Sequence, residues 1–137
     1  LRNRTGTAVI LITHDLGVIA EMADRVAVMY AGRSVEQADV NTLFNKPHHP
    51  YTQGLIESVP VLGQLKDELA TIPGNVPNLV DLPPGCRFAP RCTARQAYGL
   101  EICNQLEPDL HSVEKSDHLV RCWLYHDADG HSAPLKP

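Results

Sequence analysis

The four cysteines of this chain have the clearest potential for metal or redox chemistry. They are Cys86, Cys92, Cys103 and Cys122, spaced as C-x5-C-x10-C-x18-C. Such a set could form two disulfides, bind zinc, bind an iron–sulfur cluster or remain as free thiols. Structural zinc usually draws on cysteine pairs about two to four residues apart, and this chain has none. The spacing also differs from the compact ferredoxin patterns, so spacing alone leaves the alternatives open.

A histidine after an apolar run is the second candidate. Residues Val9 to Ile12 are apolar without alternation, which is typical of a strand buried on both faces of a parallel sheet. His14 would then lie at the carboxyl edge of the sheet, where open α/β folds bind ligands. Its imidazole could donate to a phosphate oxygen or orient a water molecule. Capping of the next helix is the simpler alternative, and the sequence pattern does not exclude it.

Short elements with clear start and stop signals follow His14. Asp15 and Asp39 are suitable N-caps for two helices. Between these helices we expect a hairpin that turns at Ala31 and Gly32. A further helix is expected to begin near Pro50 and to end at Pro60. The strands of the predicted hairpin are Val26–Tyr30 and Ser34–Gln37.

Composition and proline content limit the class and organisation of the chain. Its 137 residues carry a formal net charge of −4, so no basic surface for nucleic acid is expected. No apolar run approaches the ~20 residues of a membrane span, and no signal peptide is visible. A parallel strand with only six residues before it needs neighbours from further upstream. We therefore expect the end of a larger α/β domain, followed after residue 62 by a proline-rich, loop-like segment.

Three sequence stretches, taken in this order, resemble one family of transport ATPases. They are VILITHDLGVIAEMADRVAVMYAGRSVE (9–36), KPHHPYTQGLIESVP (46–60) and IPGNVPNLVDLPPGCRFAPRC (72–92), followed by VRCW at 120–123. The first resembles the switch-histidine region of ABC transporter ATPases. The second resembles the His-Pro-Tyr-Thr signature of the oligopeptide, dipeptide and nickel importer ATPases, and the rest resembles their C-terminal extension. The dipeptide and oligopeptide "D" subunits are the nearest type.

The resemblance implies an α/β fold, a division of the chain into four segments and a set of partner proteins. Residues 1–45 would be the C-terminal part of the ABC ATPase domain, 46–62 a helical connector, 63–124 the four-cysteine extension and 125–137 a flexible tail. His14 would be the catalytic switch histidine, in contact with the γ-phosphate of ATP bound with Mg²⁺. The expected partners are a second ATPase subunit, two transmembrane permease subunits and, indirectly, an extracellular peptide-binding protein. The location would be the cytoplasmic face of a bacterial or archaeal membrane.

The sequence lacks the motifs that would hold the nucleotide. No G-x-x-x-x-G-K-[ST] phosphate loop occurs, and the family's catalytic glutamate and signature motif are absent too. We therefore expect no ATP hydrolysis by this chain alone, although the resemblance implies an active ATPase when the subunit is complete. A free-standing, cysteine-rich metal-binding module is the alternative function, and a secreted disulfide-stapled domain is a third.

The resemblance also narrows the alternatives for the cysteines. Disulfides are rare in the cytoplasm, which leaves a metal site or free thiols. Family members with this extension resemble proteins that carry a four-iron cluster there. The resemblance therefore implies that Cys86, Cys92, Cys103 and Cys122 ligate a 4Fe-4S cluster, with zinc or free thiols as alternatives. Four arginines, three adjacent to a cysteine and one three residues past Cys92, would offset the charge of the cluster and donate to its sulfurs, unless they are simply solvated. They are Arg87, Arg91, Arg95 and Arg121.

The remaining marked residues are expected to be structural. His48, His49 and Tyr51 are predicted to cap a helix and to pack, without chemistry of their own. Trp123 is predicted to pack over whatever the cysteines hold. Four further histidines have no ligand-like spacing and are predicted to lie on the surface. They are His111, His118, His126 and His131.

Overall fold

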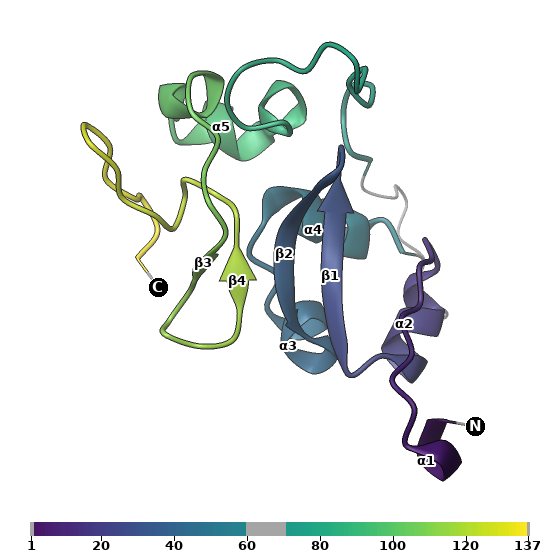
Figure 1. Ribbon diagram of the computed structural model, residues 1–137. Helices are drawn as coiled ribbons and strands as arrows, with labels where there is room; N and C mark the ends of the chain where they lie inside the picture. Colours follow the sequence, from purple (N-terminus) through teal and green to yellow (C-terminus); the bar gives the residue numbers. More distant parts are fainter. Residues whose placement is uncertain (1, 60–70, 137) are drawn as a thin grey trace.

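The computed structural model describes residues 2–59 and 71–136 (Figure 1). The predicted boundary near residue 62 lies outside these residues, whereas the helix that was predicted to end at Pro60 ends at Glu57. The first half contains α1 (Arg2–Thr5), α2 (Leu16–Met22), β1 (Arg25–Tyr30), β2 (Arg33–Asp39), α3 (Val40–Asn45) and α4 (Pro50–Glu57). The second half contains η1 (Ala89–Arg91), α5 (Thr93–Ala97), η2 (Glu101–Asn104), β3 (His111–Ser112) and β4 (Leu119–Val120).

One antiparallel sheet joins the two halves of the chain. Its strand order is β1-β2-β4-β3. The predicted β1–β2 hairpin is confirmed, and its two turn residues, Ala31 and Gly32, have φ angles of 47° and 78°. Two consecutive residues with positive φ are typical of a type I′ turn, which suits the twist of a two-stranded hairpin. On the other edge of β2, Glu36 is paired with Val120 of β4, so the C-terminal extension continues the sheet.

The helix caps follow the local sequence signals. The Asp15 carboxylate accepts from the backbone N–H groups of Gly17 and Val18 at the start of α2. Asp39 caps α3 by accepting from the Thr42 N–H. Both caps are confirmed predictions, because Asp at such a position satisfies a backbone donor that the helix cannot. Helix α4 is capped by His49, whose ring accepts from the Tyr51 N–H, and Pro50 occupies its first turn.

The predicted strand at Val9–Ile12 is wrong for this structure. Residues 7–13 have no strand structure, and the side chains of Ile10 and Ile12 are 92% and 94% exposed. A strand requires a neighbour to accept and donate its backbone hydrogen bonds. Among the described residues, no strand pairs with this segment. Its apolar character is therefore real, but the parallel sheet expected from it is not formed, and the observed sheet is antiparallel throughout.

Two hydrophobic clusters hold the hairpin and the extension together. The hairpin core consists of Tyr30, Val35 and Phe88, with the Tyr30 and Phe88 rings edge to face at 5.1 Å. The extension core is built around Trp123, as predicted for that residue. Its buried members are Ala89, Leu100, Cys103, Val113, Val120, Cys122, Trp123 and Leu124. Cys86 packs against both cores, and Leu135 from the tail packs against the extension core.

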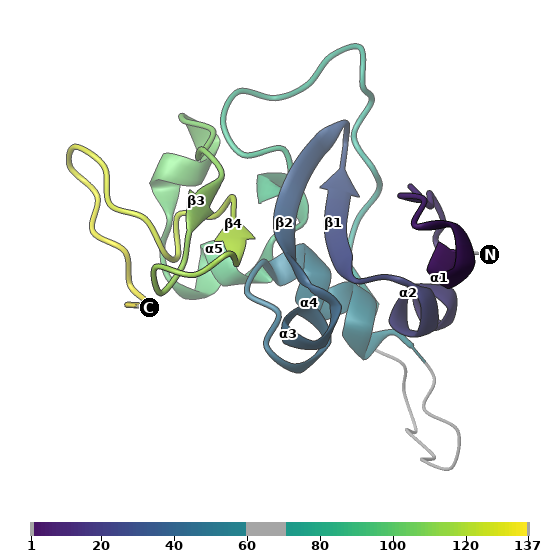
Figure 2. The ribbon, with the colours of Figure 1, turned by 60° about the horizontal axis from the view of Figure 1, so that its bottom comes forward.

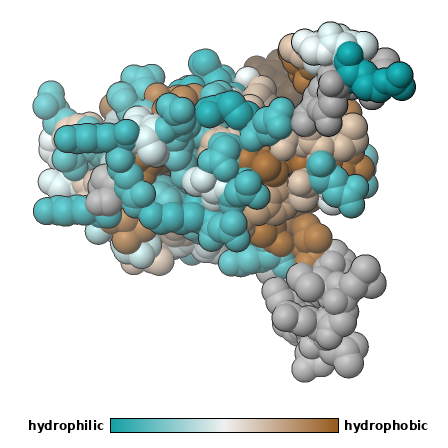
Figure 3. Space-filling view, turned by 90° about the horizontal axis from the view of Figure 1, so that it is seen from below, coloured by the Kyte–Doolittle hydropathy of each residue, from teal (hydrophilic) through white to brown (hydrophobic). Residues whose placement is uncertain are grey.

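Apolar surface gathers on the side that carries the N-terminal segments (Figure 3). The exposed large apolar side chains of the N-terminal segments include Val9, Ile10, Ile12 and Met22. The face shown is otherwise largely hydrophilic over the hairpin and the extension. None of the helices in the described parts of the chain has the length and apolar character needed to cross a bilayer.

Candidate metal and nucleotide sites

His14 lies in an exposed bend directly before α2. The Asp15 N–H donates to the Thr13 hydroxyl at 3.0 Å, and Asp15 then caps the helix, so the local chain is fixed on both sides of the histidine. Helix α2 lies beyond β1, on the opposite side of the hairpin from β4 (Figures 1 and 2). The structure therefore separates the candidate nucleotide residue from the cysteine-bearing extension.

The four cysteines come from three loops around the extension core. Cys86 and Cys92 flank η1, Cys103 lies in η2, and Cys122 follows β4. The Cys86 N–H donates to the Cys103 carbonyl oxygen at 2.8 Å. This close backbone approach requires Gly85, which has a φ of 83° and whose missing Cβ would lie 2.4 Å from the same oxygen. A glycine therefore permits the first and third cysteines to be neighbours.

The pKa values of three of the four thiols are raised in part by the charge of another cysteine. Burial is the first cause that raises the pKa of each cysteine, and it carries that of Cys103 to about 12. The charges of Cys86 and Cys92 further raise the pKa of Cys103, and those of the other three raise the pKa of Cys122. Without a bound metal the four groups are therefore protonated thiols at neutral pH. A metal would have to displace these protons to bind thiolates.

The cysteine sulfurs do not form a ready-made tetrahedral zinc site in the described parts of the chain. Tetrahedral zinc holds its thiolates at about 2.3 Å, which places the sulfurs roughly 3.8 Å apart. Within the described residues, no three cysteine sulfurs are all within 4.8 Å of one another. The Nε atom of Arg95 is buried without a hydrogen-bond partner, and the Arg95 backbone N–H donates to the Cys92 sulfur at 3.4 Å. Two buried thiols, two half-buried thiols and the unpaired Nε atom of Arg95 are groups of the type that ligate an iron–sulfur cluster and donate to its sulfurs.

The other arginines near the cysteines bind protein groups rather than sulfur. Arg91 donates to the carbonyl oxygens of Ile72 and Pro73, and Arg121 donates to those of Ser34 and Pro108. Arg87 donates to the Ala31 carbonyl at the hairpin turn. Arg87 and Arg121 therefore attach the extension to the hairpin, and Arg91 attaches η1 to an earlier part of the extension. Of the four arginines, Arg95 is the one whose positive charge lowers the pKa of Cys92 and Cys103. Burial has the larger effect on both groups and raises their pKa.

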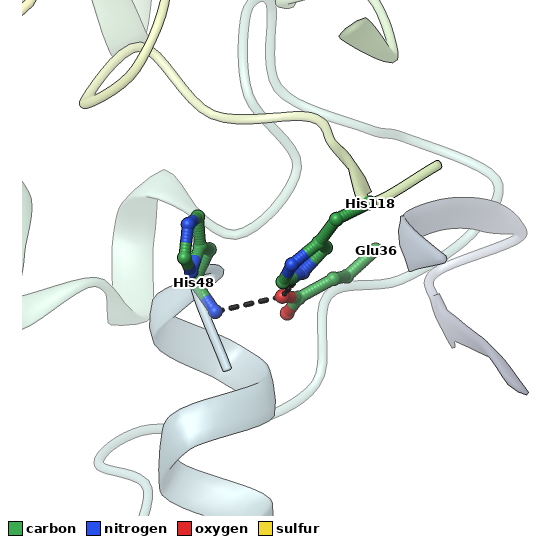
Figure 4. A group of neighbouring side chains, drawn as sticks. All are labelled: Glu36, His48 and His118. Carbon is green, nitrogen blue, oxygen red and sulfur yellow. Dashed lines mark hydrogen bonds and ion pairs between the residues drawn. The ribbon is translucent and has the colours of Figure 1, made fainter. Parts of the chain in front are cut away.

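A second polar cluster lies at the β2–β4 junction (Figure 4). The Glu36 carboxylate is fully buried and accepts from the backbone N–H groups of His48 and His49, at 2.7 and 3.0 Å. The His118 Nε2 atom lies 2.6 Å from the same carboxylate. One side chain of β2 thus joins the connector before α4 to the segment before β4. The prediction that His118 is a surface residue is wrong, since its exposure is 6%.

Ring stacking fixes His48 in this cluster. Its ring stacks on Tyr125 with centroids 4.7 Å apart and planes 20° apart, and its centroid is 4.4 Å from that of His118. Burial, followed by the neighbouring His118, lowers the pKa of His48. The predicted packing and helix capping are confirmed, because the His48 ring packs on Tyr125 and His49 caps α4. Sequence reasoning did not find the cluster, since Glu36 and His118 are 82 residues apart.

Comparisons with known proteins agree with the sequence resemblance. Residues 35–98 match the family described as "Oligopeptide/dipeptide transporter, C-terminal region". The oligopeptide transport ATP-binding protein AppD of Bacillus subtilis is 49% identical over 127 residues, which are 93% of this chain and 37% of AppD. The dipeptide transport ATP-binding protein DppD of the same organism is 46% identical over 124 residues, 90% of this chain and 36% of DppD.

The chain thus spans somewhat more than a third of the length of these relatives. Both the matched family and the relatives are defined by peptide transport. The chain therefore belongs to the family of ATP-binding subunits of oligopeptide and dipeptide ABC transporters and carries their C-terminal region.

Proposed function

We propose that this chain acts within an ATP-hydrolysing subunit that powers peptide import. The observation that carries the proposal is the similarity of about nine-tenths of the chain to peptide transport ATP-binding proteins. The proposed substrates are dipeptides or oligopeptides. The partners are a second ATPase subunit, two permease subunits and an extracellular peptide-binding protein. The subunit would use ATP and Mg²⁺ at the cytoplasmic face of a bacterial or archaeal membrane.

His14 is the residue proposed to act on the nucleotide. Its exposed position before a capped helix leaves the imidazole accessible to a γ-phosphate supplied by the rest of the ATPase domain. There it would donate to the charge that spreads over the phosphate oxygens during transfer. The chain alone has no phosphate loop, so we expect the isolated 137-residue protein to show no ATP turnover.

His14→Ala tests this role in the complete transporter. We expect ATP binding to persist and the hydrolysis rate to fall by about 10²–10³-fold, as is typical when a transition-state donor is removed. His111→Ala, at an exposed histidine of the extension, is the matched control and should keep the parental rate. ATP hydrolysis and nucleotide binding would be measured in parallel. A parental hydrolysis rate for His14→Ala would exclude the switch role.

The four cysteines are proposed to bind a 4Fe-4S cluster with a structural or redox-sensing role. Support comes from the packing of Cys86, Cys103 and Cys122 in the extension core, from the packing of Cys86 and Cys92 against the hairpin core, and from the unpaired Nε atom of Arg95. When bound, such a cluster supplies four iron–thiolate bonds and one-electron chemistry. Cys86 packs against both hydrophobic cores, so these bonds would link the extension to the hairpin.

Iron and sulfide analysis after anaerobic purification tests the cluster. We expect about four irons and four sulfides per chain, with a brown chromophore in the visible spectrum. Cys103→Ser should lose most of the iron, because a ligand is missing, whereas Ala97→Ser, at an exposed position of α5, should keep it. Colourless protein with stoichiometric zinc, or full iron content in Cys103→Ser, would exclude the assignment.

A further inference from the structure

The Glu36 cluster contains a set of metal-binding donors that the proposed function does not use. Within the described residues, Glu36, His48 and His118 are the three potential ligands whose donor atoms all lie within 4.8 Å of one another. All three side chains are buried. They come from β2, from the connector before α4 and from the segment before β4 (Figure 4). Three distant parts of the chain therefore converge on one point.

We propose that Glu36, His48 and His118 form a second metal site, for a transition-metal dication such as Zn²⁺. Two imidazoles and one carboxylate are a ligand set that zinc accepts, with a fourth position left for water. Mg²⁺ and Ca²⁺ prefer oxygen ligands and do not match two imidazoles. The set contains no sulfur, so this site is chemically distinct from the four cysteines.

The hydrogen bonds of His48 leave one ring nitrogen available. Its Nδ1 lies 3.1 Å from the Lys46 carbonyl oxygen, which can only accept. Nδ1 must therefore carry the proton, and Nε2 keeps its lone pair. Metal-bound histidines commonly have this arrangement, in which a carbonyl fixes the tautomer and the orientation of the ring. Stacking on Tyr125 restrains the ring further.

His118 has to exchange a proton for the ion. Its Nε2 lies 2.6 Å from Glu36 Oε1, and a shared proton occupies this contact. Ligands of tetrahedral zinc at about 2.0–2.1 Å are roughly 3.3 Å apart, so the two atoms would separate by less than 1 Å. The displaced proton moves to Nδ1 if the ring is neutral, or to solvent if the ring is charged. The carboxylate keeps its two backbone donors in either case.

The surrounding charges tolerate a dication. Glu36 contributes one negative charge and is buried, so an ion would compensate it more completely than His118 alone can. At the rim of the cluster, Lys46 and Glu114 form an ion pair that is neutral as a unit. The Glu36–His118 contact, the His48 backbone N–H bond to Glu36 and the stacking of the His48 ring on Tyr125 already hold the three residues in place without an ion. Little ordering is therefore needed on binding.

Cobalt titration tests the proposal, because Co²⁺ reports on its ligands. Thiolate ligands give an intense charge-transfer band in the near ultraviolet, whereas nitrogen and oxygen ligands give only visible d–d bands. With the metal-free 137-residue chain, we expect one Co²⁺ to bind with d–d bands that appear without the thiolate band. His118→Gln can still donate to Glu36 but has no imidazole, and its affinity for this ion should fall at least 100-fold. His111→Gln, an exposed histidine, is the matched control.

A measurement on the unaltered chain covers the case in which His118→Gln does not fold. Long-range ¹H–¹⁵N spectra of the imidazole rings should show His48 and His118 shift when Zn²⁺ is added, with the His118 proton leaving Nε2. Spectra of both rings that stay unchanged in excess Zn²⁺ would overturn the proposal. So would cobalt spectra that contain only thiolate bands, or equal cobalt affinity in folded His118→Gln. Those results would leave the cluster as a hydrogen-bonded junction.

Discussion

The hairpin–extension region and the N-terminal segment use similar apolar residues to opposite effect. Val120 of β4 is 0% exposed, whereas Ile10 is 92% exposed. Helix α2 has no buried residue, although its sequence has an apolar face. The hairpin contacts the extension through β4, Phe88 and two arginines, Arg87 and Arg121. This difference shows that an apolar sequence pattern indicates only a tendency to be buried. A paired strand also requires a neighbouring backbone with which to form hydrogen bonds.

Truncation of a buried aromatic should give the largest effect. Trp123 is 6% exposed, and its indole N–H donates to the Leu106 carbonyl at 2.8 Å. Trp123→Ala should lower the free energy of unfolding by about 3–5 kcal/mol, because the change leaves a cavity and an unpaired acceptor. Ile10→Ala, the matched change in the N-terminal segment, should stay within about 0.5 kcal/mol. Urea denaturation measures both, and similar losses would remove the contrast between the two regions.

Lowering the pH should reduce the free energy of unfolding by an amount between those of the other two predictions. Burial lowers the pKa of His49 to about 3, from an ordinary value of 6.5. Between these two values the unfolded chain binds a proton that the folded chain does not. Stability should therefore fall as the pH decreases from 6.5 towards 3, by at most about 1.4 kcal/mol per pH unit from this group.

His49→Asn separates the titration of His49 from its capping role. Asn can still accept from the Tyr51 N–H, because it is a favourable N-cap residue, but it does not titrate. The variant should show a shallower decline of unfolding free energy between pH 6.5 and pH 4. Urea denaturation at several pH values measures this slope. Equal slopes in the two proteins would mean that His49 is not held neutral by burial.

The smallest effect on stability is expected from the exposed apolar segment. Replacing Ile10 and Ile12 by Ser should leave the unfolding free energy of the monomer nearly unchanged, since both side chains are almost fully exposed. It should reduce self-association, because contiguous exposed apolar side chains favour contacts between copies. Sedimentation of the parent and the double variant over a range of concentrations measures this. If the double variant associates as strongly as the parent, the self-association involves another surface of the protein.

Local chemistry explains what could be predicted from the sequence. The turn at Ala31 and Gly32 and the Asp15 and Asp39 caps depend on residues within a few positions of one another. The pairing of Glu36 with His118 depends on an antiparallel contact between segments 82 residues apart, which no local pattern records. A buried carboxylate in a short strand also contradicts the usual exposure of Glu. The Glu36–His118 contact at the β2–β4 junction could therefore not be predicted from the sequence.

The cysteines illustrate an intermediate case. Their residue type identified a candidate metal site, but their spacing did not show that Cys86 and Cys103 would be joined by a backbone hydrogen bond. That contact depends on the positive φ of Gly85, and a Pro-Pro-Gly sequence is compatible with several turns. The arginines were expected to face sulfur, yet Arg91 and Arg121 bind carbonyl groups. Proximity in sequence therefore identified which arginines lie near the cysteines, but it did not predict the hydrogen bonds that these arginines form.

The pairing of β2 with β4 has a consequence during protein synthesis. Glu36 leaves the ribosome 84 residues before its partner Val120. At ~5–20 residues per second, the outer edge of β2 waits on the order of 5 to 15 seconds for its strand partner. During this interval the edge has free backbone groups, and the Glu36 carboxylate lacks His118. A nascent chain that pauses between the two strands would expose an open strand edge to its neighbours on the same messenger RNA.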